Sequence, residues 1–189
     1  MKKNIELFIK DSIAAKEELL RSQIGNIESA VNIIIDSLKA GKKLLVFGNG
    51  GSASDSQHIA AELVGRFKME RKALPAIALT TNTSILTAIA NDYGYDVVFS
   101  RQIEALGVQG DVALGISTSG NSKNVIEAFK KARTIGMKTI ALSGGDGGSM
   151  KKEADLSIVV GTKDTPRIQE SHILIAHIIC ALVEEGMFK

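Results

Sequence analysis

Two stretches rich in glycine and hydroxyl groups carry the residue types that bind an anion. Gly48-Asn49-Gly50-Gly51-Ser52-Ala53 lies between an apolar run and a helical pattern, and Ser117-Thr118-Ser119-Gly120-Asn121-Ser122 has the same position later in the chain. A glycine turn can bring its N–H groups close to a ligand, and a helix N-terminus adds unpaired N–H groups and a partial positive charge. One hydroxyl would suffice to cap a helix, whereas the second stretch has four. Together they predict a site for a phosphate monoester.

Three ionisable side chains could move protons beside a ligand held by the first stretch. His58 and Glu62 are four residues apart in a helical pattern and therefore lie on one face. Glu62 is the candidate general base, and the alternative is an ordinary solvated helix charge. His177 stands in an otherwise apolar helical run, where a histidine is more often a hydrogen-bonded core residue than a catalyst. The residues alone leave both alternatives open.

These side chains need a scaffold, which the hydrophobic pattern from residue 43 onward describes. Apolar runs of strand length alternate with helical patterns, and continuous apolar strands are typical of a parallel sheet covered on both faces. We therefore predict an α/β fold with a doubly wound, five-stranded parallel sheet, flavodoxin-like or Rossmann-like in three layers, with ligands at the carboxyl ends of the strands. Strands are expected at 43–47, 76–80, 111–116, 139–142 and 156–160, and helices near 53–67, 83–90, 96–106, 122–135, 147–153 and 166–185.

Two amphipathic helices are predicted ahead of this sheet, over residues 3–39, with a joint at Gly25-Asn26 and an end at Gly41. A doubly wound sheet does not require two further helices ahead of its first strand, so we expect these helices to bury apolar surface against another subunit. No domain boundary is visible, and we expect a single domain over 1–189. In it, residues 1–41 form a helical oligomerisation segment and 42–189 form the sheet and the final helix.

Composition excludes several classes of function. The chain has 189 residues, 44% hydrophobic and 23% charged, with a net charge of +2 that is too small to argue for nucleic acid or a membrane surface. The single cysteine, Cys180, lies in an apolar run and is expected to be a buried thiol. Neither a signal peptide nor an apolar run of about 20 residues is evident, so we expect a cytoplasmic protein. A third glycine-rich stretch, Ser143-Gly144-Gly145-Asp146-Gly147-Gly148, is interpreted as a flexible connection.

Nucleotide-binding patterns match poorly. The first stretch fits G-x-G-x-x-G/A, but the acid that should end the second strand is missing, since that strand ends Leu79-Thr80-Thr81-Asn82. No Gly-Lys-Ser/Thr follows the glycines, so the Walker pattern fails too. Two separate hydroxyl-bearing loops favour a sugar phosphate over a nucleotide.

Taken together, the motifs resemble those of the phosphoheptose isomerases, in the sugar-isomerase-domain (SIS) superfamily. The resemblance spans almost the whole chain and rests on the two loops, on Gln57-His58-Ile59-Ala60-Ala61-Glu62-Leu63, on Asn91-Asp92, and on Arg167-Ile168-Gln169-Glu170 with His172 and His177. It implies an aldose–ketose isomerase that converts sedoheptulose 7-phosphate to D-glycero-D-manno-heptose 7-phosphate through an enediol. It also implies a cytoplasmic homotetramer that supplies heptose for surface polysaccharide such as lipopolysaccharide or capsule, often with bound zinc.

The resemblance also assigns roles to residues. Glu62 is the expected base and His177 the expected acid, while His172 is supportive. The implied zinc ligands are His58, Glu62, Gln169 and His177. The implied substrate contacts are Asn49, Gly50, Gly51, Ser52, His58, Glu62, Asn91, Asp92, Ser117, Thr118, Ser119, Ser122 and Gln169, with Asn91 and Asp92 expected from a neighbouring subunit. The segment Asp164-Thr165-Pro166-Arg167 departs from relatives that have an aspartate just before the arginine, so no role is assigned to Asp164.

Two alternatives remain open at this point. A related family of replication-initiation-associating proteins shares the fold and the serine loop and works by binding a protein partner, but it lacks the glutamate and the final histidine. The other alternative is an isomerase of a different sugar phosphate, such as a pentose or an amino sugar. A regulatory sugar-sensing domain is disfavoured, because the leading helices have no basic recognition face.

Overall fold

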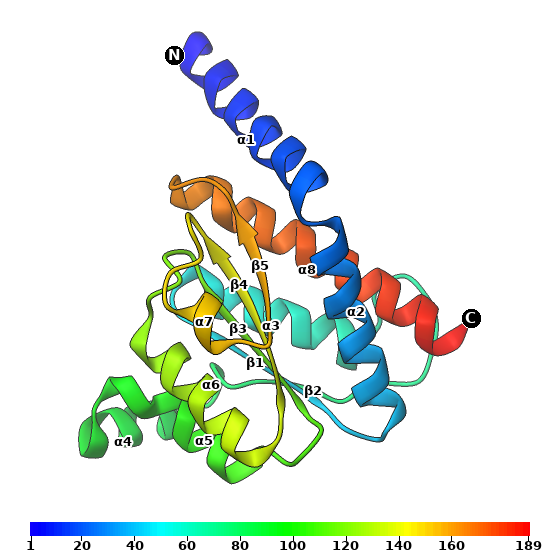
Figure 1. Cartoon of the computed structure of the whole chain (residues 1–189), viewed down its shortest axis with the longest axis vertical. Helices are drawn as coiled ribbons and strands as arrows, with labels where there is room; N and C mark the ends of the chain where they lie inside the picture. The colour runs from blue at the N-terminus through cyan, green and yellow to red at the C-terminus, as the bar shows by residue number, and fades with distance from the viewer.

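Five parallel strands form one sheet in the order β2-β1-β3-β4-β5 (Figure 1). The computed structural model describes the whole chain, Met1–Lys189. The strands are β1 (Leu44–Gly48), β2 (Ala76–Ala78), β3 (Val112–Ser117), β4 (Lys138–Gly144) and β5 (Leu156–Val160). The predicted five-stranded parallel sheet is confirmed, and each strand overlaps its predicted range.

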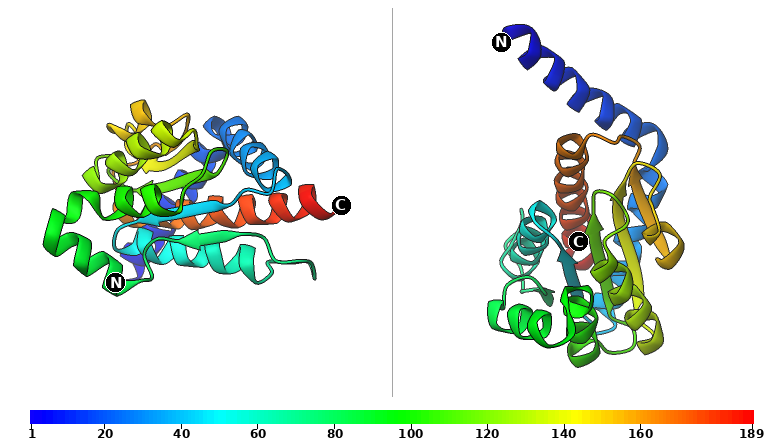
Figure 2. Two further views of the ribbon diagram at one scale, coloured as in Figure 1. Left: turned by 90° about the horizontal axis from the view of Figure 1, so that it is seen from below. Right: turned by 90° about the vertical axis from the view of Figure 1, so that its left-hand side faces the viewer.

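Helices cover both faces of the sheet and make three layers (Figure 2). Alternate strand residues point to opposite faces, so Leu44 and Val46 join one core while Leu45 and Phe47 join the other. The first core is closed by α2 (Ile24–Lys39), α3 (Gly51–Val64) and α8 (Thr165–Phe188), and the second by α5 (Val98–Leu106), α6 (Lys123–Ile135) and α7 (Met150–Glu153). The exposed helix α4 (Thr83–Tyr93) and the 3-10 turn η1 (Tyr95–Val97) extend the second layer.

Helix α1 (Lys2–Ser22) projects from the body of the protein and buries only Leu19 (Figure 1). Six of its large apolar side chains are about half exposed or more: Ile5, Leu7, Phe8, Ile9, Ile13 and Leu20. The predicted joint is wrong by two residues, because the chain turns at Gln23 and Gly25 lies inside α2. An added Cβ at Gly25 would meet nothing within 4 Å, so that glycine marks no special backbone position. Gly41, at φ +73°, follows the end of α2 as expected.

The last helix, α8, is long and apolar enough to cross a membrane by length and composition alone, a test that core helices of soluble proteins also pass. Here it crosses one face of the sheet, and Ile175, Ile179 and Val183 are buried in the first core. Cys180 lies among them as expected, and burial raises the pKa of its thiol to about 12.

Candidate active site

The first two loops leave the sheet side by side. β1 and β3 are neighbours, with Gly48 paired to Ile116, so both chains reach the carboxyl edge together. A Cβ at Gly48 would lie 2.8 Å from the Ile116 carbonyl oxygen and 2.8 Å from the Ser52 Cβ, which explains the glycine. Beyond the strands, the side-chain amides of Asn49 and Asn124 exchange two hydrogen bonds, of 3.0 and 2.9 Å. This amide pair ties the first turn to the start of α6.

The serine loop keeps its hydroxyls together. The Ser117 and Ser122 Oγ atoms are 2.8 Å apart, and the Ser117 and Ser119 Oγ atoms are 3.4 Å apart. Ser122 is the N-cap residue of α6, yet its side chain makes no capping hydrogen bond. The hydroxyls are therefore not used up as a helix cap and can donate to an anion at the positive end of α6.

The third glycine-rich stretch, interpreted from the sequence as a flexible connection, is packed against the serine loop. The Met150 N–H donates to the Gly120 carbonyl at 2.9 Å, and a Cβ on Gly120 would overlap the Gly147 carbonyl. A cavity of about 240 Å³ lies between the two loops and the start of α8; its walls include Thr118, Ser119, Gly144, Gly145, Asp146 and Lys163. The Gly148 N–H bond lowers the pKa of Asp146, and the charge of Lys163 lowers it further. Lys163 thus lies beside the serine loop, although the sequence analysis did not single it out.

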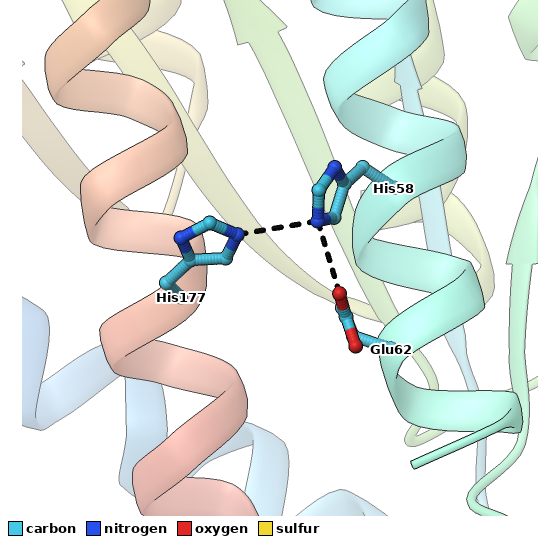
Figure 3. Close-up of side chains that lie close together, drawn as sticks. All are labelled: His58, Glu62 and His177. Carbon is cyan, nitrogen blue, oxygen red and sulfur yellow. Dashed lines mark hydrogen bonds and ion pairs between the residues drawn. The ribbon is translucent and has the colours of Figure 1, made fainter. Parts of the chain in front are cut away.

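His58, Glu62 and His177 meet where α3 and α8 lie side by side (Figure 3). The His58 Nε2 atom is 3.0 Å from Glu62 Oε1 and 3.2 Å from His177 Nε2. One ligand atom from each residue lies within 4.8 Å of the other two. The ring of Phe67 stacks on His177 with centroids 5.4 Å apart. The structure therefore brings together all three proton-transfer candidates, from helices more than 100 residues apart in sequence.

Gln169 lies at the other end of the same helix pair. Its amide touches Gly51, where an added Cβ would overlap the Nε2 atom. Seven residues separate Gly51 from His58 on α3, which is about 10 Å along the helix axis. The interface of α3 and α8 thus runs from the first loop, with Gln169, to the His58–Glu62–His177 cluster.

Two predicted site residues lie outside this arrangement within one chain. Asn91 and Asp92 are exposed near the end of α4, which buries none of its residues, and the Asn91 amide donates to Asp92 at 2.9 Å. α4 projects from the second layer of helices (Figure 1). A single chain therefore does not bring these two residues to the His58–Glu62–His177 cluster.

His172 is a hydrogen-bonded residue of the protein core. It is fully buried, and its Nε2–H donates to the Ser143 carbonyl at 3.1 Å, which fastens α8 to β4. Burial lowers the pKa of its ring to about 4, so it is neutral near pH 7. It lies outside the three-residue cluster and fits the supportive role expected of it.

Sequence reasoning missed other polar residues of the site. Asp55 lies one turn before His58 on α3; its Oδ2 atom is enclosed without a partner, and burial raises the pKa of its carboxyl. The feature of the sequence that could have identified Asp55 was its spacing from His58. The signal for Asn124 was weaker, because its partner Asn49 lies 75 residues away.

Comparisons with known proteins agree with this geometry. The chain matches the SIS domain family over residues 7–144. It is 57% identical to a phosphoheptose isomerase of Clostridium acetobutylicum over all of this chain and 97% of that protein, and 60% identical to one of Geobacter sulfurreducens over 91% of each. A phosphoheptose isomerase structure from Neisseria gonorrhoeae superposes with a TM-score of 0.93 at 45% identity, over 97% of this chain and 98% of that one. A phosphoheptose isomerase structure from Francisella tularensis superposes with a TM-score of 0.94 at 38% identity, over 97% of each chain.

Proposed function

This chain belongs to the SIS domain family and, within it, to the phosphoheptose isomerases, and from that premise we propose that it interconverts sedoheptulose 7-phosphate and D-glycero-D-manno-heptose 7-phosphate. The product would serve heptose precursor synthesis for surface polysaccharide in the cytoplasm. One observation supports the proposal: the hydroxyl-rich loop lies beside the start of α8, and the same helix meets α3 where a carboxylate and two imidazoles come together. The binding-module alternative finds no support among the relatives above, which are named as isomerases.

We assign phosphate recognition to the two loops. Ser117, Thr118, Ser119 and Ser122 would donate O–H and N–H hydrogen bonds to the phosphate, helped by the dipole of α6. Asn49, Gly50, Gly51, Ser52 and Gln169 would contact the sugar along the helix interface. The stretch from Gly51 to His58 spans about 10 Å, which suits a long sugar held by its phosphate with the reacting carbons at the far end.

The proton transfers fall to Glu62 and His177. In the ketose-to-aldose direction, Glu62 would take a proton from C1 while His177 gives one to the C2 carbonyl oxygen, which yields the enediol. Return of the carbon-bound proton to C2, with loss of the O1 proton, completes the aldose. His58 lies between the two residues, at 3.0 and 3.2 Å, and holds the carboxylate beside the imidazole. Phe67 stacks on one face of the His177 ring and limits its orientation.

The same three residues fit a divalent metal. Two imidazoles and a carboxylate, each offering one ligand atom within 4.8 Å, form a donor set that zinc accepts. We propose that His58, Glu62 and His177 would hold zinc, with Gln169 of the same helix as the fourth ligand that the family resemblance implies. Bound there, zinc would supply Lewis-acid polarisation of the sugar oxygens.

We further propose a homotetramer. The half-exposed apolar side chains of α1 support this, because they have no partner within one chain. The position of Asn91 and Asp92 on the projecting α4 also supports it, since a neighbouring subunit could present them to the sugar.

Turnover of sedoheptulose 7-phosphate by the purified chain tests the function, with zinc supplied and the aldoheptose phosphate measured directly. Glu62→Gln should abolish turnover while the protein still binds the sugar phosphate. The same assay with pentose and amino-sugar phosphates decides between this substrate and another one. A wild-type protein that isomerises only a different sugar phosphate would refute the substrate assignment, and one that isomerises none would refute the enzyme.

A further inference from the structure

A buried ion pair lies where the C-terminal end of α3 meets α8. Arg71 Nε is 2.9 Å from Glu184 Oε1, and both side chains are 1% exposed. Burying two charges is costly unless hydrogen bonds satisfy the remaining donors and acceptors. Because Arg71 belongs to the connection after α3 and Glu184 to α8, the pair joins the two helices that carry His58, Glu62 and His177.

The guanidinium of Arg71 holds the end of α3. The last carbonyls of a helix have no partners inside the helix, and Arg71 donates to those of Glu62 and Leu63 at 2.8 and 2.7 Å. It also donates to Gly65 and Lys72, at 3.1 and 3.2 Å. The Glu62 backbone, from which the proposed base projects, is thus fixed directly by Arg71.

The carboxylate of Glu184 holds the chain that follows α3. It accepts the N–H groups of Phe67, Lys68 and Met69 at 2.8, 2.8 and 3.1 Å. Burial alone would raise its pKa, but these N–H groups and Arg71 hold the pKa below its ordinary value. Phe67 is thereby placed against the His177 ring, at 26° and 5.4 Å. Glu184 is seven residues, about two turns, beyond His177 on α8.

We propose that Arg71 and Glu184 are positioning residues, which set the spacing of α3 and α8 and so hold Glu62 and His58 in register with His177. The pair touches neither substrate nor the reacting atoms. It acts through the Glu62 backbone on one side and through Phe67 on the other. The effect of this ion pair on catalysis rests on the proposed function, whereas its effect on the positions of the His58 and His177 rings does not.

The test compares Arg71→Met with a matched control, Lys43→Met. Lys43 Nζ pairs with the buried Asp111 at 2.6 Å, just before β1 and β3 and therefore at the opposite edge of the sheet. Both variants remove the cation from an ion pair whose carboxylate is buried, but only the Arg71–Glu184 pair contacts the site. Arg71→Lys and Glu184→Gln, milder changes at the same pair, carry the comparison if Arg71→Met does not fold.

Histidine NMR of the metal-free protein is the first measurement, since the chain has three histidines. Arg71→Met should shift the ring resonances of His177 and His58 and leave those of His172 in place, whereas Lys43→Met should leave all three. Co²⁺ titration is the second measurement, and the affinity should fall about 10- to 100-fold in Arg71→Met alone, as for other residues that orient metal ligands. In turnover, kcat should fall while KM changes little, because the phosphate loops are untouched.

Equal behaviour of Arg71→Met and Lys43→Met in ring shifts, Co²⁺ affinity and kcat, at a temperature where both are folded, would overturn the inference and leave the pair a purely structural one. Moved ring shifts in a protein whose wild type turns over no sugar phosphate would instead overturn the proposed function and leave the positioning role standing.

Discussion

Acidification should destabilise this protein through the buried ring of His172. The ring is fully buried and donates to Ser143, and burial lowers its pKa from 6.5 to about 4. The unfolded chain therefore takes up a proton at this residue first as the pH falls. Stability is full above pH 6.5 and declines from there toward pH 4.

The size of the effect follows from the two pKa values of His172. Each pKa unit corresponds to ~1.4 kcal/mol in the free energy of unfolding. The full loss of stability is therefore roughly 3 kcal/mol, of which about 2 kcal/mol is lost by pH 5. For a chain of this length, 2 kcal/mol corresponds to a fall in Tm of about 4–8 °C.

Thermal or urea unfolding between pH 7.5 and 5, at fixed protein concentration and with a chelator present, measures this loss. The scan stops at pH 5 because Glu184, whose pKa lies below its usual 4.5, loses its contribution only at lower pH. His172→Gln should be less stable at pH 7.5 yet should lose less stability on acidification. If His172→Gln loses as much stability as the wild type between pH 7 and 5, the buried imidazole is not the cause.

Three further predictions concern the loops and α1. Ser122→Ala should raise KM for the sugar phosphate by about 10-fold or more in steady-state kinetics, because a hydroxyl bonded to a charged group contributes about 1.5–3 kcal/mol; an unchanged KM would argue against the serine loop as the phosphate site. Gly120→Ala should lower the urea midpoint more than Gly145→Ala, since both glycines have φ +65° but only Gly120 meets backbone atoms; equal midpoints would mean that the packing of the two loops contributes nothing. Ile9→Glu on α1 should reduce the mass in sedimentation equilibrium, and an unchanged mass would place the subunit interface elsewhere.

Much of the fold could be predicted because its signals are local. Each strand is a short, mostly apolar run, and both faces of a parallel sheet are buried. The hydrophobic pattern and the length of each run were therefore enough to predict the strands. The helix joint was misplaced because Gly25 was interpreted as a break, whereas Gln23 makes the turn and Gly25 continues α2. A single glycine in a helix is tolerated.

The site was predictable in part for the same reason. The serine loop and the pair His58 and Glu62 are patterns within one short stretch. Arg71 and Glu184 are 113 residues apart, and nothing local distinguishes either from a solvated surface charge. Lys163 was not predicted as a site residue because only the folded chain places it beside the serine loop.

The place of α8 in the chain bears on how this enzyme could be redesigned. The match to the SIS domain family ends at residue 144, so the shared portion contains both proposed phosphate loops, His58 and Glu62, but not the final helix. Gln169, His177 and Glu184 all belong to that helix. A graft of a different terminal helix onto the same portion would change both ends of the proposed pocket, because α8 carries His177 and its start also lines the cavity beside the serine loop. Libraries that seek new sugar specificities therefore have a compact target in 24 consecutive residues.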